Sequence, residues 1–274
     1  MKLVIQIPCL NEAQTLPGTL ADLPTAIPGV DCIETLVVDD GSIDGTSEVA
    51  RAHGVHHVVR LRRQKGLAAA FMAGIDASLQ AGADLIVNTD ADNQYAGSDI
   101  ARLVEPLLAG TADIVIGDRN IRDQRQMSWS KRWLQRLGSW TVRQVSNTTV
   151  PDTTSGFRAY TRDAALRMTI VSEFSYTLES IIQAGKKRMA IAHVPVSTNA
   201  RTRPSRLFHS IWSYLKRSGA TIVRIYAVYE PLKVFTYIGA VIFALGFLVS
   251  LRFLYYYFFS YEPGKIQSLI FSAV

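Results

Sequence analysis

Cysteine and charged residues are both scarce in this chain. Cys9 and Cys32 are the two cysteines in 274 residues, and both lie in or beside apolar, strand-like segments. They predict small buried thiols and exclude a disulfide framework. Charged residues make up 19% of the chain, whereas hydrophobic residues make up 48%. This apolar excess predicts one large domain with an apolar appendage rather than a wholly soluble protein.

Several common sequence signals are also missing. Neither a GxGxxG motif nor a Walker loop occurs, so dinucleotide and P-loop chemistry are not indicated. A secretory signal peptide is not expected, because Lys2 leads directly into the strand-like run Leu3–Ile7. We therefore expect the folded part of the chain to stay on the cytoplasmic side of a membrane.

The longest apolar segment lies near the C-terminus. It covers 234–259, where Arg252 is the only charged residue. Its length predicts a transmembrane helix within 231–260, since a buried core helix rarely stays apolar on every side for so long. A turn and the start of a second apolar segment follow in 261–274. Basic residues before the span agree with a cytoplasmic N-terminal flank; they are Lys216, Arg217, Arg224 and Lys233.

Charge is divided unevenly along the chain. Residues 1–118 contain 7 Lys/Arg and 16 Asp/Glu, whereas residues 119–224 contain 19 and 5. The basic part also holds all four tryptophans, which are Trp129, Trp133, Trp140 and Trp212. Their spacing within 127–147 and 206–229 predicts amphipathic helices at a membrane interface. Core-packing helices are the alternative, and the basic part alone would also permit nucleic-acid binding. The adjoining apolar span favours the membrane and no nucleic acid.

The acidic part alternates strands with helices. Strands are expected at Leu3–Pro8, Glu34–Asp39, His56–Leu61, Asp84–Thr89 and Asp113–Gly117, and helices near Ala13, Asp44, Lys65 and Ser98. This alternation predicts an α/β fold with a Rossmann-like, mostly parallel sheet flanked by helices. We expect this domain to span 1–200 and a basic loop with a juxtamembrane amphipathic helix to span 201–230.

Polar motifs follow each expected strand at its carboxyl end, where such sheets bind ligands. They are Asn11-Glu12, Asp39-Asp40-Gly41-Ser42, Gln64-Lys65-Gly66, Asp90-Ala91-Asp92-Asn93-Gln94 and Gly117-Asp118-Arg119. Asp90 and Asp92 present two carboxylates on one side of a strand end, which suits a divalent cation on a diphosphate. Each motif alone could be a turn or a helix cap. Their occurrence at five strand ends favours a binding crevice.

In this order the motifs resemble those of the family 2 glycosyltransferases of the GT-A fold, and among these the polyisoprenyl-phosphate branch typified by dolichol-phosphate mannose synthase. The resemblance covers residues 1–206. It is carried by Pro8-Cys9-Leu10-Asn11-Glu12, Val38-Asp39-Asp40-Gly41-Ser42, Lys65-Gly66, Asp90-Ala91-Asp92-Asn93-Gln94, Gly117-Asp118-Arg119 and Ser155-Gly156-Phe157-Arg158. It implies a membrane-anchored, inverting transfer of a hexose from a UDP- or GDP-sugar to undecaprenyl or dolichyl phosphate, with Mg²⁺ or Mn²⁺ as cofactor. Homo-oligomerisation stays open.

The resemblance also implies a role for individual residues. The catalytic residues would be Asp92, Arg119 and Arg158. The metal ligands would be Asp90, Asp92 and Gln94. The nucleotide-sugar site would contain Pro8, Leu10, Glu12, Asp39, Asp40, Lys65, Asp90, Ala91, Asp92, Arg119, Arg201 and Arg206. The lipid phosphate would meet Lys131, Arg132, Arg136 and Ser155.

Two departures from the family pattern concern charged residues. Asp118 stands where family members usually have serine, which adds a carboxylate beside the expected site. Arg206 ends Arg203-Pro204-Ser205-Arg206, where many relatives have a Gly-x-Ser-Lys loop, so arginine replaces a phosphate-binding lysine. Arginine binds phosphate in a bidentate manner that lysine does not reproduce.

Two other functions share some of these features. A processive polysaccharide synthase would contain the same sheet and the Asp-x-Asp motif, but its Gln-x-x-Arg-Trp signature is missing, since Trp129 stands three places before Arg132-Trp133. A non-catalytic membrane scaffold that binds nucleotides would not need both metal carboxylates and Arg119. The sugar and the base of the donor stay open.

Overall fold

The structure is a computed structural model that describes residues 1–119, 143, 146, 148, 150–171, 176–199, 219–220, 223–224, 226–259 and 266–273. The chain forms two compact units, Met1–Ile222 and Val223–Val274. The four tryptophans lie outside the described residues, as do most of the expected interfacial segments 127–147 and 206–229.

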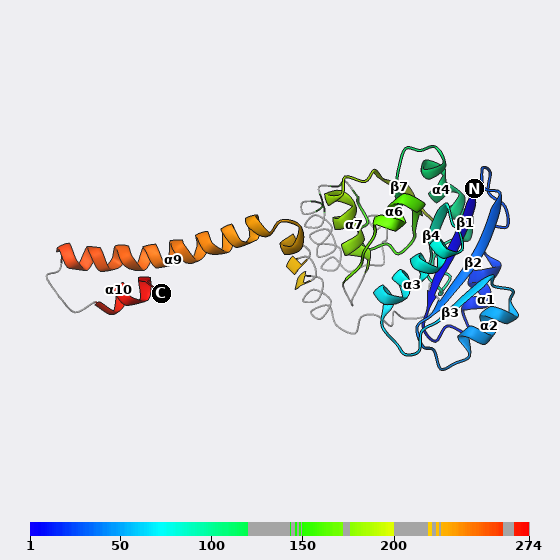
Figure 1. Cartoon of the computed structure of the whole chain (residues 1–274), viewed down its shortest axis with the longest axis horizontal. Helices are drawn as coiled ribbons and strands as arrows, with labels where there is room; N and C mark the ends of the chain where they lie inside the picture. The colour runs from blue at the N-terminus through cyan, green and yellow to red at the C-terminus, as the bar shows by residue number, and fades with distance from the viewer. Residues whose placement is uncertain are drawn as a thin grey trace. The chain divides into compact units, whose positions relative to one another are not determined.

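A seven-stranded sheet forms the centre of the first unit (Figure 1). Its strands are β1 (Lys2–Cys9), β2 (Cys32–Asp39), β3 (His57–Arg60), β4 (Leu85–Asn88), β5 (Ile114–Asp118), β6 (Arg158–Thr161) and β7 (Ile191–Pro195). The spatial order is β3-β2-β1-β4-β6-β5-β7. Only β6 runs antiparallel, between β4 and β5, and the other pairs are parallel. The mostly parallel sheet expected from the sequence is confirmed.

The apolar runs explain why the central strands form where they do. In β1 the residues from Leu3 to Cys9 are all buried, because helices cover both faces of the sheet. Strands covered on both sides read as continuous apolar runs rather than as an alternation. The five expected strands are present, with ends displaced by at most two residues. Strands β6 and β7 were not expected, since neither contains such a run.

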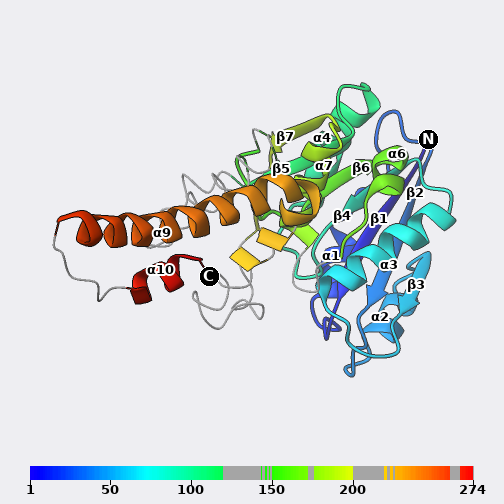
Figure 2. The ribbon, with the colours of Figure 1, turned by 60° about the vertical axis from the view of Figure 1, so that its left-hand side comes forward.

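Helices cover both faces of the sheet (Figure 2). One face carries α1 (Leu16–Ala21), α2 (Thr46–Ala52), the short 3-10 helix η1 (Gly97–Asp99) and α4 (Ile100–Leu108); the other carries α3 (Leu67–Gln80), α6 (Arg162–Arg167) and α7 (Tyr176–Lys186). Leu3, Ile5 and Val87 pack under α4 in one apolar core. On the opposite face Gly74 of α3 lies so close to Gln6 that an added Cβ would be 2.3 Å from its Oε1. The helix and the sheet therefore pack in close contact.

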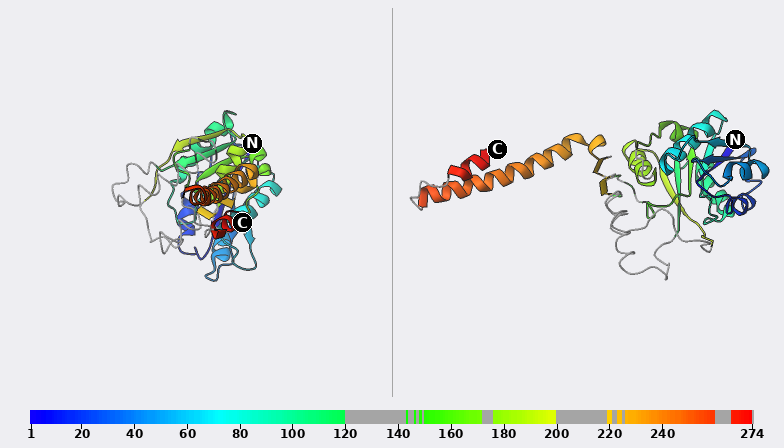
Figure 3. Two further views of the ribbon diagram at one scale, coloured as in Figure 1. Left: turned by 90° about the vertical axis from the view of Figure 1, so that its left-hand side faces the viewer. Right: turned by 90° about the horizontal axis from the view of Figure 1, so that it is seen from below.

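The described residues of the second unit lie mainly in two apolar helices. Helix α9 (Pro231–Phe259) has a mean hydropathy of 2.3 in its most apolar stretch, none of which is buried. It is the one helix among the described residues that is long and apolar enough to cross a membrane. Helix α10 (Ile266–Ala273) lies alongside α9 (Figure 3), and a Cβ added to Gly246 would be 3.1 Å from the carbonyl oxygen of Ser272.

Candidate functional site

The loops that carry the polar motifs meet at one edge of the sheet. Six strands run in the same direction, so their carboxyl ends share this edge. Antiparallel β6 begins at the same edge, because Arg158 pairs with Asn88 of β4 and with Ile116 of β5. The antiparallel strand therefore brings Ser155 and Gly156 to the carboxyl ends of the parallel strands.

Hydrogen bonds join the loops after β1 and β2. The amide of Asn11 donates to Ser42 Oγ at 2.9 Å, and Asn11 Oδ1 accepts from the amide of Ile43 at 3.0 Å. The amide of Glu12 donates to Thr46 Oγ1 at 3.0 Å. Asn11 has a φ of 55°, a left-handed conformation that asparagine tolerates better than most residues. These contacts fix the backbone on this side of the edge.

Asp39 and Asp40 direct their carboxylates into the protein. Asp39 is 1% exposed and accepts hydrogen bonds from the amide of Ser42 at 2.7 Å and from the hydroxyl of Ser47. Asp40 is 3% exposed and accepts from the amides of Lys65 and Gly66 at 2.7 and 2.8 Å. Both side chains stabilise the loops around the expected nucleotide site. Their direct contact with a nucleotide stays a prediction.

Other residues expected around the nucleotide lie at the same edge. Pro8 is buried within β1, Leu10 is partly exposed just after it, and the side chain of Lys65 is exposed. Glu12 is 9% exposed, and its Oε2 accepts a hydrogen bond from Thr15 Oγ1 at 2.6 Å. The structure thus places these residues together, while their roles stay predictions.

Hydrogen bonds from neighbouring segments to its backbone fix the loop that contains Asp90, Asp92 and Gln94. Ala91 is buried, and its carbonyl oxygen accepts a hydrogen bond from Thr19 Oγ1 at 3.0 Å. Asn199 donates its amide to the carbonyl of Gln94 at 2.8 Å and its Nδ2 to the carbonyl of Asn93 at 3.0 Å. Asn93 has a φ of 53°. The side chain of Gln94 is partly exposed, whereas its backbone N–H donates to Asp92 Oδ1 at 3.2 Å.

The environment of Asp90 fits a bound cation. Burial and then the negative charge of Asp92 raise the pKa of Asp90 to about 6. Gly156 leaves space for this carboxylate, since an added Cβ would be 3.0 Å from Asp90 Oδ1. No group of three His, Cys, Asp or Glu side chains that could hold a metal ion occurs in the described part of the chain. Asp90 and Asp92 alone are fewer oxygen ligands than a hard divalent cation takes, so binding of Mg²⁺ or Mn²⁺ by these two carboxylates stays a prediction that requires further oxygen ligands from a bound ligand and water.

Arg119 follows β5 and forms a bidentate pair with Asp152. Nε of Arg119 is 2.7 Å from Asp152 Oδ2, Nη2 is 3.0 Å from Asp152 Oδ1, and Nη2 also donates to Thr154 Oγ1 at 2.8 Å. The Arg119 side chain is 15% exposed and that of Asp152 is 2% exposed. The positive charge of Arg119 acts on Asp90 by lowering its pKa, against the larger opposing effects of burial and Asp92. Arg119 thus belongs to the same electrostatic cluster as the two aspartates.

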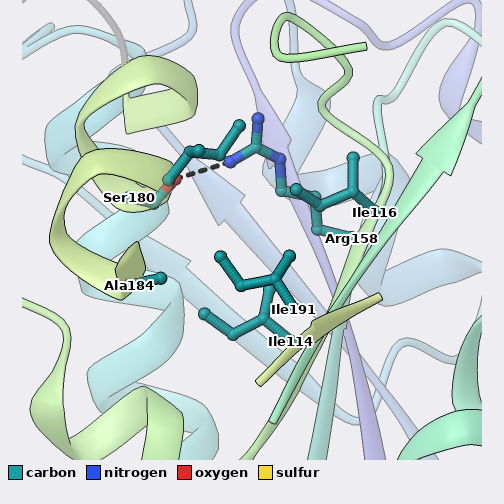
Figure 4. Close-up of a pocket in the computed structure, with 7 residues that line it drawn as sticks. Ile114, Ile116, Arg158, Ser180, Ala184 and Ile191 are labelled. Atoms are coloured by element: carbon teal, nitrogen blue, oxygen red, sulfur yellow. Dashed lines mark hydrogen bonds between the residues drawn. The ribbon is translucent and has the colours of Figure 1, made fainter. Parts of the chain in front are cut away.

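Arg158 is fully buried beneath the site. Its Nε donates to the carbonyl of Ser155 at 2.8 Å, Nη2 to the carbonyl of Thr153 at 3.0 Å, and Nη1 to Ser180 Oγ at 2.5 Å. It also lines a small, mainly apolar pocket between α7 and the sheet (Figure 4). Ser155, expected at the lipid phosphate, is fully buried as well. Direct contact of Arg158 or Ser155 with a substrate stays a prediction, and the contacts of Arg158 support a positioning role.

Sequence reasoning missed several residues that shape the site. Asp152, Thr154 and Asn199 carry no motif, although a carboxylate three residues before Ser155 is visible in the sequence. Asn88 was also missed; its Nδ2 donates to the carbonyl of Gly156 at 2.8 Å and to the Tyr176 hydroxyl at 2.9 Å. The remaining expected site residues lie outside the described residues; they are Lys131, Arg132, Arg136, Arg201 and Arg206.

Known proteins resemble the chain in sequence and in fold. It is 30% identical over 207 residues to the undecaprenyl-phosphate mannosyltransferase of Micrococcus luteus, covering 72% of this chain and 83% of that protein. It is 29% identical over 209 residues to the polyprenol monophosphomannose synthase of Mycolicibacterium smegmatis, covering 72% and 77%. A crystal structure of glucosyl-3-phosphoglycerate synthase from Mycobacterium tuberculosis, in complex with Mn²⁺, UDP and glucosyl-3-phosphoglycerate, has a TM-score of 0.60 at 21% identity, covering 83% and 79%.

The sequence model of one family covers most of the sheet-containing unit. The model described as glycosyl transferase family 2 matches residues 4–168, more than half of the chain. This range includes the motif loops after β1 to β5 and the Ser155–Arg158 segment. The chain is therefore a family 2 glycosyltransferase with a GT-A fold.

Proposed function

We propose that the protein transfers a hexose from a nucleotide-diphosphate sugar to a polyprenyl phosphate at a membrane, with its catalytic unit on the cytoplasmic side. The observation that carries this proposal is the cluster of Asp90, Asp92 and Arg119 at one edge of the sheet. The names of the two relatives, which specify undecaprenyl phosphate and polyprenol monophosphomannose, support the acceptor class. Helix α9 supports the membrane location.

The donor requires both signs of charge at this edge. Asp90 and Asp92 would hold Mg²⁺ or Mn²⁺ on the diphosphate, with Gln94 as a third candidate ligand. When bound, such an ion supplies positive charge that stabilises the leaving diphosphate. Arg119 adds a fixed positive charge beside the same group. Preorganised charges of this kind cost no reorganisation when the sugar–phosphate bond breaks.

The acceptor needs positioning more than deprotonation. Its phosphate is mostly doubly ionised at neutral pH, because the second pKa of a phosphate monoester is about 6. One of its oxygens attacks the anomeric carbon from the side opposite the diphosphate, so the new bond forms as the old one breaks and the configuration inverts. The nucleoside diphosphate leaves with the bonding electrons. We therefore assign no general base, and we expect cationic side chains to hold the lipid phosphate.

Transfer of radiolabelled sugar tests this proposal directly. The full chain in lipid nanodiscs would be incubated with undecaprenyl or dolichyl phosphate and, in turn, UDP-glucose, UDP-galactose, UDP-N-acetylglucosamine and GDP-mannose. We expect one donor to yield a labelled lipid phosphate sugar, with the signal lost in EDTA and restored by Mg²⁺ or Mn²⁺. Absence of such a lipid product with every donor would contradict the proposal. A long polymer product would indicate a processive enzyme instead.

A further inference from the structure

Arg119 is held by a network whose members carry no recognised motif. Both carboxylate oxygens of Asp152 accept hydrogen bonds from the guanidinium, at 2.7 Å from Nε and 3.0 Å from Nη2. Thr154 Oγ1 accepts a second bond from Nη2 at 2.8 Å and is itself 3.0 Å from Asp152 Oδ1. Two parallel hydrogen bonds fix the plane of the guanidinium as well as its position. The side chain of Arg119 is therefore oriented by the protein before any ligand binds.

This arrangement separates the donors of Arg119 into two groups. The guanidinium has five N–H donors. The Nε donor and the two Nη2 donors are used by the bonds to Asp152 and Thr154, in which Nη1 takes no part. Within the described part of the chain, these bonds leave the Nη1 edge of the guanidinium for a phosphate oxygen.

Asp152 itself is not placed to act as a metal ligand or a base. Its carboxylate is 2% exposed, and each oxygen already accepts a hydrogen bond from Arg119. Burial opposes its ionisation, but the hydrogen bonds and charge of Arg119 outweigh burial and lower the pKa of Asp152. A carboxylate held in its ionised form by an arginine is a poor proton acceptor. Any effect of Asp152 on the substrate would therefore be indirect, through the position of Arg119.

Asp152 also connects two parts of the site. Arg119 extends from the end of β5, whereas Asp152 belongs to the loop that leads through Ser155 and Gly156 into β6. Gly156 borders the Asp90 carboxylate. The ion pair therefore joins the arginine to the loop that lies against the metal-binding aspartate.

We propose that Asp152 is a positioning residue, which orients Arg119 so that its Nη1 edge meets the diphosphate of the donor beside Asp90. This inference rests on the proposed function, because it assumes that a nucleotide diphosphate binds at Asp90 and Asp92. Residues that orient the ligands of a metal ion typically change affinity or activity about 10- to 100-fold when they are altered, and we expect an effect of similar size for a residue that orients Arg119. Thr154 contributes to the same orientation with one acceptor.

A double-mutant cycle between Asp152 and Arg119 tests the proposal. The variants would be Asp152→Asn, Arg119→Ala and the double variant, in full-length protein in nanodiscs. Two quantities would be measured for each variant: kcat and KM for sugar transfer, and the Kd for the Mn²⁺ complex of the nucleoside diphosphate by calorimetry. We expect Asp152→Asn to lower kcat/KM and weaken nucleotide binding by about 10-fold or more in the wild-type background. We expect it to have little further effect when Arg119 is already alanine.

Controls separate orientation from stability. Asp163→Asn removes a carboxylate from an exposed Arg167 pair of 3.0 Å on α6, and it should leave both quantities unchanged. If Asp152→Asn fails to fold, Thr154→Val removes the acceptor of Nη2 together with the hydroxyl that donates to Asp152 Oδ1, and it should give a smaller loss that also disappears in the Arg119→Ala background.

Two results would overturn the inference. One is an equal effect of Asp152→Asn with and without Arg119; the other is a lowered melting temperature with unchanged kcat/KM and Kd. The calorimetric cycle uses no lipid acceptor. It therefore still tests the role of Asp152 if polyprenyl phosphate proves to be the wrong acceptor. An inactive wild-type protein that still binds the nucleotide complex would count against the proposed function, and the cycle in Kd would still decide on Asp152.

Discussion

Asp90 is a residue at which the expected binding of a cation and the stability of the folded protein oppose each other. Burial and the charge of Asp92 raise its pKa to about 6, so the metal-free protein at neutral pH contains a charge that its surroundings disfavour. The folded state binds the proton more tightly than the unfolded state. The stabilising contribution of this proton is therefore fully present below pH 4 or so and is lost as the pH rises through about 6.

Replacing Asp90 by asparagine should stabilise the metal-free protein near neutral pH. In EDTA at pH 7.5, Asp90→Asn should increase the free energy of unfolding by up to about 3 kcal/mol, because the disfavoured charge is removed. Near pH 4 the variant and the wild type should be equally stable. Thermal unfolding in nanodiscs across this pH range measures the difference. Equal melting temperatures at pH 7.5 in EDTA would show that the charge carries no such cost.

Gly156 should be sensitive to the addition of a single methyl group. A Cβ at this position would be 3.0 Å from both Asp90 Oδ1 and the Tyr176 hydroxyl, closer than side chains normally approach. We expect Gly156→Ala to destabilise the fold by about 1–3 kcal/mol through overpacking. Displacement of Asp90 should also weaken Mn²⁺ binding, measured by calorimetry, by about 10-fold. Gly18→Ala is the matched control, since a Cβ there meets nothing within 4 Å. Unchanged Mn²⁺ affinity in Gly156→Ala would contradict the expectation that the added methyl group displaces Asp90 from a metal-binding position.

At the scale of elements, helix α9 can be recognised from sequence far more readily than β6. The apolar length of α9 is a local property that needs no knowledge of the fold. Strand β6 has four residues and contains the buried Arg158, whose guanidinium donates hydrogen bonds to Ser155, Thr153 and Ser180 and lies over the ring of Tyr176. No local sequence pattern predicts that an arginine will be buried with such partners. The antiparallel strand, and with it the approach of Asp152 to Arg119, was therefore not predicted.

A charge near the middle of α9 should impair membrane insertion, whereas one near its end should not. Leu245 lies midway along the helix, and Phe258 lies beside the tyrosines at its end. Leu245→Arg should cost about 2.5–3.5 kcal/mol in insertion, because the guanidinium would sit at the bilayer centre. Phe258→Arg should cost much less, since its charge can reach the interface. The membrane-bound fraction after carbonate extraction measures both. Equal retention of the two variants would argue against a spanning α9.

For the molecule as a whole, the sequence predicted which polar residues gather at the carboxyl edge of the sheet, but it did not predict the contacts between their side chains. Apolar runs locate the central strands, and parallel strands place their carboxyl ends together, so the grouping of Asp90, Asp92 and Arg119 followed from local patterns. The partners of each side chain depend on strand pairing between distant segments. Arg119 was expected at this edge from its position after a strand, whereas its partner Asp152 is separated from it by 33 residues and was not expected. Arg158 shows the same limit, since residue type gave its charge and not its burial.

The uneven charge of the chain should appear in how the enzyme responds to salt. The family resemblance implies that Lys131, Arg132 and Arg136 meet the lipid phosphate, which stays a prediction. Each cation near an anionic membrane surface contributes about 1 kcal/mol. Replacing all three by alanine should therefore raise the KM for polyprenyl phosphate by at least about 10-fold at low salt, with the KM for the nucleotide sugar almost unchanged. The difference should shrink as salt is raised, because exposed charges are screened.

The control removes the same charge from exposed arginines of α2, α4 and α6, through Arg51→Ala, Arg102→Ala and Arg167→Ala. Kinetics from low to high salt would measure both variants, and equal changes in lipid KM would mean that net charge acts alone, without a basic surface directed at the lipid.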